Sequence, residues 1–248
     1  MQIQTIEELS LNALPALQQI LDDGWVLRLA NGYTKRANSV TPLYPVAIES
    51  SLNYKIARCE KIYQNFDLPP IFRLTNTSQR SDLDRTLDGL GYIKQDYVSV
   101  RAKAIEDLPI FKGDCEVVIE EELTTEWLDS YVHAAEVPFQ HWNTMSTMLE
   151  IIPHPTCYAM LKYRDRLCSC GLGVLERNYL GIFFFVTARQ QRRRGYATQL
   201  ISAMADWGKS NGATQVYLQV ETANQAGINL YNKLGFTEIY QYFYRLKL

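Results

Sequence analysis

The chain has 248 residues, of which 25 are Lys or Arg and 27 are Asp or Glu, so its formal net charge is −2 with histidine neutral. Proteins that bind nucleic acid through its phosphates usually carry a broad positive excess, which this chain lacks. No apolar run approaches the roughly 20 residues of a membrane span. The N-terminus lacks the basic and apolar regions of a signal peptide, and five scattered cysteines favour a reducing compartment, so we expect a cytoplasmic protein.

Two segments of the first hundred residues carry a signal. Gly24 to Val40 is polar and aromatic. It could be functional, but its Asn31-Gly32 pair is a common hairpin turn signal, so a structural hairpin is the favoured interpretation. Further on, Leu87-Asp-Gly-Leu-Gly-Tyr92 is followed by an aromatic strand from Ile93 to Val100. We expect a domain linker near Ala104 to Pro109.

The next part of the chain alternates strand and helix patterns up to an arginine-rich turn. Thr124 precedes a helix pattern as a capping residue, with acidic residues near the first turns. Ile182 to Val186 is apolar, β-branched and aromatic, which is typical of a strand buried on both faces. In chain order, we expect a strand at 115–120, helices at 124–136 and 144–152, a hairpin of strands at 158–163 and 168–175, and a strand at 182–186.

Four arginines, Arg189 and Arg192 to Arg194, lie between that strand and a helix that starts at Tyr196. The first N–H groups of a helix have no partner within it, and the helix dipole leaves that end partly positive. Gly195 lets the backbone approach a ligand closely, so the turn could bind a phosphate, with the arginines adding charge-assisted contacts. An exposed basic turn without a ligand is the alternative interpretation.

Beyond this helix, which we expect to stop at Asn211-Gly212, the pattern continues to the end of the chain. Gln215 to Glu221 alternates like a strand, and a short helix from Gln225 closes at Gly235. The aromatic-rich residues from Phe236 onward predict a last strand.

Two motifs in this half resemble those of a known superfamily. Arg192-x-x-Gly195-x-Ala197, within residues 186–201, is similar to the pyrophosphate-binding turn of the GNAT superfamily of acetyl-CoA-dependent N-acetyltransferases. Residues 224–239 are similar to its second signature, Asn-x-x-Ala-x-x-x-Tyr-x-x-x-Gly-Phe, with slightly different spacing. The resemblance covers roughly residues 115–248.

The resemblance implies an α/β fold with a mixed, mostly antiparallel central sheet flanked by helices. We expect a catalytic GNAT domain at residues 106–248. The implied cofactor is acetyl-CoA. The residues expected to bind it are Phe185, Val186 and Thr187 along the pantetheine arm, Arg192, Arg193, Arg194, Gly195, Tyr196, Ala197 and Thr198 around the pyrophosphate, and Asn224 near the pantetheine.

The resemblance also implies catalytic and substrate-binding positions. Tyr231 would protonate the leaving thiolate as general acid. The strand before the turn contains no Glu where many family members have one, so the base stays open among Glu221, Glu176 and Glu136, with Glu221 placed first. The residues expected to line the acceptor site, between the two early helices, are Pro138, Phe139, His141 and Trp142.

Residues 1–105 resemble a smaller, degenerate copy of the same domain. Leu87 to Tyr92 matches Tyr231 to Phe236 at a constant offset of 144 residues. Ile48 to Asn53 has neither the glycine nor the arginine of the phosphate turn, and Leu87 replaces the catalytic tyrosine. We therefore expect no acetyl-CoA site in this copy.

The predicted function is transfer of acetyl from acetyl-CoA directly to a primary amine through a tetrahedral intermediate. A non-catalytic acyl-CoA sensor and a nucleic-acid-binding module using the arginine turn are the alternatives. Tyr231 favours the enzyme over the sensor, and the net charge disfavours the module. We expect a small-molecule or peptide amine as partner, no membrane and no metal, since the three histidines lack a metal-ligand spacing. The sequence does not indicate an oligomeric state.

Overall fold

The computed structural model describes residues 2–45, 51–75, 82–111 and 113–247. Within them, eleven strands and seven α-helices divide into two compact units. The first unit comprises Met1–Ser99, Glu221–Ala223 and Tyr240–Leu248, and the second comprises Val100–Val220 and Asn224–Ile239. No helix in the described part of the chain is long and apolar enough to cross a membrane.

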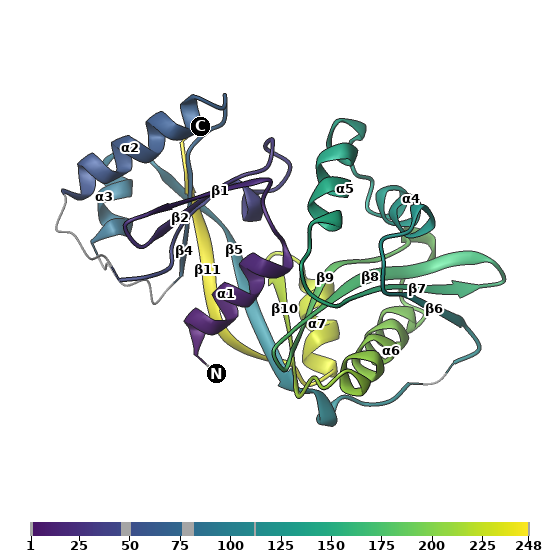
Figure 1. The fold of residues 1–248 in the computed structure, drawn as a ribbon. Coiled ribbons are helices and arrows are strands. Elements are labelled where there is room, and N and C mark those ends of the chain that lie inside the picture. Colours follow the sequence, from purple (N-terminus) through teal and green to yellow (C-terminus); the bar gives the residue numbers. More distant parts are fainter. Residues whose placement is uncertain (1, 46–50, 76–81, 112, 248) are drawn as a thin grey trace. The chain divides into compact units, whose positions relative to one another are not determined.

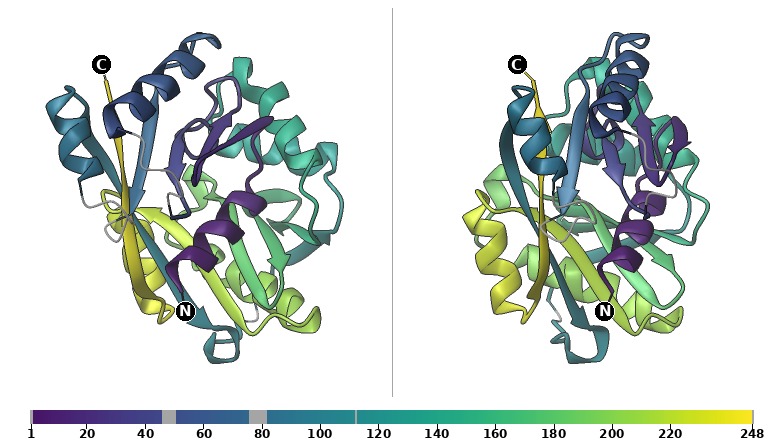
Figure 2. Two further views of the ribbon diagram at one scale, coloured as in Figure 1. Left: turned by 60° about the vertical axis from the view of Figure 1, so that its left-hand side comes forward. Right: turned by 90° about the vertical axis from the view of Figure 1, so that its left-hand side faces the viewer.

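The first unit is a sheet covered by helices, in the strand order β1-β2-β3-β4-β11-β5. Antiparallel pairing joins β1 to β2, β2 to β3 and β4 to β11, whereas β3 and β4 run parallel. Figure 2 shows the end of β11, in yellow, entering this unit. The elements are α1 (Ile3–Ala13), β1 (Gln18–Asp22), β2 (Trp25–Leu29), η1 (Lys35–Ala37), β3 (Val40–Pro42), α2 (Leu52–Gln64), β4 (Ile71–Thr75), α3 (Leu83–Gly89), β5 (Ile93–Ala104) and β11 (Thr237–Leu246).

In the second unit, the strand order continues from β5 as β10-β9-β8-β7-β6. Antiparallel pairing joins β6 to β7, β7 to β8 and β8 to β9, and only β9 and β10 of these strands are parallel. The predicted α/β fold with a mixed, mostly antiparallel sheet is thus confirmed. The elements are η2 (Ile105–Asp107), β6 (Glu116–Glu120), α4 (Thr125–Ala134), η3 (Phe139–His141), α5 (Trp142–Glu150), β7 (Thr156–Tyr163), β8 (Arg166–Glu176), β9 (Tyr179–Thr187), η4 (Arg189–Gln191), α6 (Tyr196–Ser210), β10 (Gln215–Glu221) and α7 (Gln225–Lys233).

Helices cover both faces of the second unit's sheet because the β7 side chains alternate between two apolar cores. Ala159 packs in the cluster that contains Met204 of α6. The neighbouring Tyr158 meets Trp127 of α4 on the other face, with ring centroids 5.1 Å apart. The Trp127 indole N–H also reaches the carbonyls of Ala159 and Gly171 at 3.3 Å, which holds α4 against β7 and β8. Figure 1 shows α6 on one side of these strands and α4 and α5 on the other.

The offset of 144 residues appears in the backbone as well as in the sequence. In both Leu87–Tyr92 and Tyr231–Phe236, the amide of the last residue donates to the carbonyl of the first at 2.9 Å. Gly91 and Gly235 close the two helices with φ of +84° and +81°, a conformation that favours glycine. The two copies therefore share one helix-ending geometry. Part of the segment Ile48 to Asn53, where the first copy lacks the phosphate turn, lies outside the described residues.

The segment Gly24 to Val40 forms the β2–β3 hairpin, as expected. The side chain of Asn38 stabilises the long loop that connects the two strands. The Asn38 side-chain oxygen accepts from the amides of Ala30 at 2.8 Å and Gly32 at 3.0 Å. The segment expected as a linker, Ala104 to Pro109, packs into the second unit, where Ile105 is buried.

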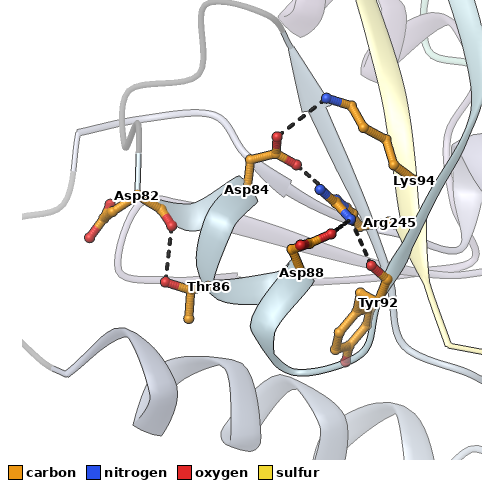
Figure 3. Close-up of polar contacts among 7 residues, drawn as sticks. All are labelled: Asp82, Asp84, Thr86, Asp88, Tyr92, Lys94 and Arg245. Atoms are coloured by element: carbon orange, nitrogen blue, oxygen red, sulfur yellow. Dashed lines mark hydrogen bonds and ion pairs between the residues drawn. The ribbon is translucent and has the colours of Figure 1, made fainter.

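A salt-bridge cluster fastens α3 to the last strand of the first unit, as Figure 3 shows. The Arg245 guanidinium donates to Asp84 at 2.8 Å, to Asp88 at 2.6 Å and to the carbonyl of Tyr92 at 2.7 Å. Lys94 lies 3.3 Å from the other oxygen of Asp84. Burial alone would raise the pKa of Asp84, but the hydrogen bonds from Arg245 and Lys94 outweigh it, and the pKa lies below its usual value.

Asp84→Asn should lower the free energy of unfolding by about 1 kcal/mol at pH 7, since a half-exposed, charge-assisted pair contributes on that order. Because the folded pKa is lower than the unfolded one, ionised Asp84 stabilises the fold above pH about 4, and this stabilisation is lost as the pH falls through the folded pKa. Urea unfolding of the variant and wild type at pH 7 and pH 3 should show a difference that shrinks in acid. The control Asp165→Asn, at an exposed hairpin tip, should change neither value. A difference independent of pH would contradict the ionic role.

Candidate active site

The second unit contains a gap in its sheet where two parallel strands part. β9 and β10 pair at four positions, from Tyr179 with Gln215 to Ile182 with Leu218. Both strands continue, but β9 has no β10 partner from Phe183 to Thr187 in the described structure. The backbone edge of β9 that faces β10 is therefore open to a ligand that can pair with it as a strand does.

A bulge in β9 coincides with this parting. Phe184 has φ of +45°, and the register between β8 and β9 shifts between Cys170 and Leu172. Gly171 lies opposite the shift, where a Cβ would stand 2.7 Å from the Phe185 ring. Bulges bend a strand and redirect its side chains, and they are frequent beside active sites.

The arginine turn follows β9 and presents unpaired backbone amides. After η4, Arg193 and Gly195 adopt left-handed φ of +63° and +81°, and Gly195 is the N-cap of α6. Among the described residues, the amides from Arg193 to Thr198 donate no hydrogen bond; the Gln199 amide is the first to do so, to the carbonyl of Gly195 at 3.1 Å. The turn thus has the row of free donors that an anion needs.

The surroundings of Gly195 leave room for that anion. A Cβ built on Gly195 meets no atom within 4 Å, so the position faces open space. The four arginines of the turn are exposed, and none forms a salt bridge with a described carboxylate. Arg192 is the one held by a backbone contact, from its Nε to the carbonyl of Thr187 at 3.3 Å. The amides, the open space and the unpaired cations together fit a pyrophosphate.

A pocket of about 460 Å³ lies beside the open part of β9. Phe185, Val186 and Arg192, which the sequence assigned to the cofactor, line it together with Arg189 and residues from the end of α4. The lining residues that the sequence analysis missed are Tyr131, Ala134 and Ala135. No local motif marks these three, because only the packing of α4 on the sheet brings them to β9.

Tyr231 lies on α7, in the same unit. Its side chain is 8% exposed, and its ring packs on Phe236 with centroids 5.8 Å apart. Burial raises the pKa of Tyr231 to about 12, so the phenol stays protonated at neutral pH. Its hydroxyl makes no hydrogen bond to any described residue, whereas Asn224, at the start of the same helix, uses its side-chain oxygen to cap the amide of Gly227 at 2.9 Å.

The residues expected at the acceptor site form an aromatic cluster between α4 and α5. Phe139 is 81% exposed, and its ring lies 5.3 Å from that of Trp142. The Trp142 indole N–H is committed to the carbonyl of Val137 at 2.8 Å. His141 lies between them in sequence and makes a side-chain contact with Gln140 at 3.3 Å. None of the three lines the pocket beside β9.

The three candidate bases differ in their surroundings. Glu136 lines the pocket beside β9. Glu176 lies 3.2 Å from His154 and 4.0 Å from Arg177, so it takes part in a separate salt-bridge cluster. Glu221 is exposed at the end of β10.

Comparisons with known proteins identify relatives of the chain and of its fold. Residues 1–245 match the family described as "Probable histone acetyltransferase Rv0428c C-terminal". The chain is 29% identical, over 99% of its length and 98% of the relative's, to the uncharacterized N-acetyltransferase YobR of Bacillus subtilis. A GCN5-related N-acetyltransferase from Kribbella flavida has the same fold, with a TM-score of 0.74 at 14% identity, over 100% of this chain and 96% of that one. A tandem GNAT protein from the clavulanic acid biosynthesis pathway gives 0.70 at 10% identity, over 97% and 86%.

A fold of this kind, with parted parallel strands beside an amide-lined turn, defines a GNAT-type N-acetyltransferase. The chain belongs to the Rv0428c C-terminal family of acetyltransferases within that superfamily. Membership of the superfamily implies the use of acetyl-CoA, whose pyrophosphate the arginine turn fits.

Gly195→Ala should raise the Kd for acetyl-CoA about tenfold or more, because its Cβ would occupy the space in front of the free amides and weaken charge-assisted hydrogen bonds. Gly212→Ala is the matched control, since Gly212 ends the same helix with φ of +91° and also has no atom within 4 Å of a built Cβ. Both variants carry similar backbone strain, so their unfolding temperatures should be similar. Calorimetry should show a raised Kd for acetyl-CoA in Gly195→Ala alone. Equal affinities of the two variants for acetyl-CoA would favour the alternative interpretation, an exposed basic turn without a ligand.

Proposed function

We propose that the protein transfers acetyl from acetyl-CoA directly to a primary amine, and that the transfer takes place where β9 leaves β10. The observation that carries this proposal is the open backbone edge of Phe183 to Thr187 directly before a turn of unpaired amides. A pantetheine arm contains amide groups, so it can pair with such an edge as an added strand. The adjoining turn then receives the pyrophosphate.

In this arrangement the cofactor is held mainly by backbone groups. The amides from Arg193 to Ala197 and the Thr198 hydroxyl bind the pyrophosphate, and Arg192 to Arg194 add charge. Phe185, Val186 and Thr187 align the pantetheine arm. Asn224 lies near the pantetheine arm. Its side chain caps α7 and so fixes the helix that carries Tyr231.

The reaction needs a polarised carbonyl and a neutral amine. A backbone N–H near Val186 or Thr187 stabilises the oxyanion as the amine attacks the thioester carbon. The tetrahedral intermediate then collapses, its C–S bond breaks, and the thiolate of coenzyme A leaves. Tyr231 donates its proton to that thiolate, a role for which its raised pKa keeps it in the protonated form.

The base that neutralises the amine is a carboxylate. Glu136 is favoured by its place in the pocket beside β9, and Glu221 is the residue that the sequence placed first. The variants Glu136→Gln and Glu221→Gln distinguish the two candidates. Loss of the general base should move the acidic limb of the pH profile of kcat to higher pH, whereas loss of a carboxylate with no catalytic role should not.

A covalent acetyl-cysteine route is disfavoured by the state of the thiols. Burial raises the pKa of Cys157 and Cys170 to about 12, and it also raises the pKa of Cys115 and Cys168. These groups are thiols at neutral pH, and a thiol is a poor nucleophile compared with its thiolate.

The test of the proposed activity is a panel of primary amines, with release of coenzyme A from acetyl-CoA as readout. Acetylation of at least one class of amine, with a single bound acetyl-CoA per chain by calorimetry, is the expected result. Tight binding of acetyl-CoA without acetylation of any amine would favour the acyl-CoA sensor instead.

Tyr231→Phe should reduce kcat by about two to four orders of magnitude and leave the Kd for acetyl-CoA nearly unchanged. The substitution removes only the hydroxyl, which acts on a thiolate that exists after the C–S bond begins to break. The measurement is single-turnover kinetics, so that chemistry limits the rate, together with calorimetry.

Tyr158→Phe is the control for this experiment. Its hydroxyl donates to the carbonyl of Leu149 at 3.1 Å in the core of the same unit, so its loss should reduce stability more than turnover. Full turnover in Tyr231→Phe would make Tyr231 a packing residue and remove the general acid from the proposal.

A further inference from the structure

Three charged side chains line the pocket beside β9: the carboxylate of Glu136 and the guanidinium groups of Arg189 and Arg192. Glu136 and Arg189 both line this volume of about 460 Å³. Neither forms a salt bridge or a side-chain hydrogen bond with another described residue, and they do not pair with each other. Both side chains are exposed, so both charges are available to a ligand that enters the pocket.

Local structure holds each charge at its place. Glu136 follows α4 in a left-handed conformation, with φ of +53°, and its amide donates to the carbonyl of His133 at 3.4 Å. Arg189 starts η4, which the amide of Gln191 closes by donating to the carbonyl of Ala188 at 2.8 Å. The two charged groups therefore come from separate backbone segments, the end of α4 and the start of η4, that line one pocket.

The rest of the pocket wall comes from the end of α4 and from β9. Tyr131 stacks on Trp127 with centroids 5.5 Å apart and planes within 2°, and it meets Phe184 edge-on at 5.2 Å. Ala134 and Ala135 add a small, flat surface. A cavity of this size suits one small molecule, since such pockets range from about 300 to 1,000 Å³.

We propose that the acceptor is zwitterionic, an α-amino acid or a molecule of similar size that carries a carboxylate close to its amine. Arg189 binds the carboxylate, and Glu136 faces the amine that attacks the thioester. The inference rests on the proposed acetyl transfer and adds the acceptor's class. A lysine side chain within a protein carries no such carboxylate beside its amine and would leave Arg189 unmatched.

The test compares matched acceptors that differ only at the carboxylate. A panel of α-amino acids and the corresponding α-carboxamides is assayed for kcat/KM with wild type, Arg189→Met and Arg189→Lys. Wild type should prefer the acids by about 10- to 100-fold, the usual value of a hydrogen bond between charged groups. Arg189→Met should reduce the preference to near one, and Arg189→Lys should restore part of it. Arg164→Met, at the exposed tip of the β7–β8 hairpin, should retain the full preference.

Three results would overturn the inference. If wild type acetylated carboxamides with the same kcat/KM as the acids, the proposed carboxylate site would be wrong, whereas the proposed acetyl transfer would stand. A raised Kd of Arg189→Met for acetyl-CoA, with an unchanged preference between acceptors, would assign Arg189 to the cofactor. Failure of wild type to acetylate any amine, although acetyl-CoA binds, would overturn the proposed function and this inference with it.

Discussion

The parting of β9 from β10 after Ile182 is the constraint on which the active-site architecture depends. These parallel strands pair at four residue positions, and the pairing then stops although both strands continue. An unpaired strand edge inside a sheet is unfavourable in isolation, because backbone donors and acceptors need partners. The bulge at Phe184 and the absence of a side chain at Gly171 allow β9 to turn away. Pairing between β9 and β10 is thus absent from Phe183 to Thr187 of the described structure, and the proposed cofactor arm would restore it there.

The two copies of the domain show which features belong to the fold and which belong to the chemistry. Both end a helix with the same glycine geometry and the same backbone hydrogen bond. The first residue of this helix-ending segment is Tyr231 in the second copy and Leu87 in the first. The Tyr231 hydroxyl forms no hydrogen bond with a described residue, and Leu87 is fully buried. A leucine satisfies the packing but cannot donate a proton. The shared geometry therefore persists without the hydroxyl that we propose as general acid, as expected if core packing maintains this geometry in the first copy.

Much of the second unit follows from local signals, and the sequence predicts it well. Gly195 and the Asn211-Gly212 pair mark the two ends of α6, and the β10 bounds agree with the alternating pattern. Other features depend on contacts between distant residues. β11 pairs with β4 in the first unit, with Tyr242 opposite Thr75, so the compact units do not follow a single cut in the chain. Helix α1 was not predicted; its buried Glu7 pairs with Arg73 of β4, a contact that no spacing reveals.

The charge distribution explains why a chain of net charge −2 can carry so basic a turn. A cation near the N-terminus of a helix opposes the helix dipole and costs about 0.3 to 1 kcal/mol when exposed. Arg192, Arg193 and Arg194 stand at that end of α6 without a described carboxylate to offset them. The amides from Arg193 to Thr198 donate no hydrogen bond in the described structure, so the turn combines unpaired cations with free N–H donors. A pyrophosphate bound here, as proposed, would remove this repulsion as well as form its own hydrogen bonds. The proposed ligand therefore accounts for a basic turn that the stability of the fold alone does not favour.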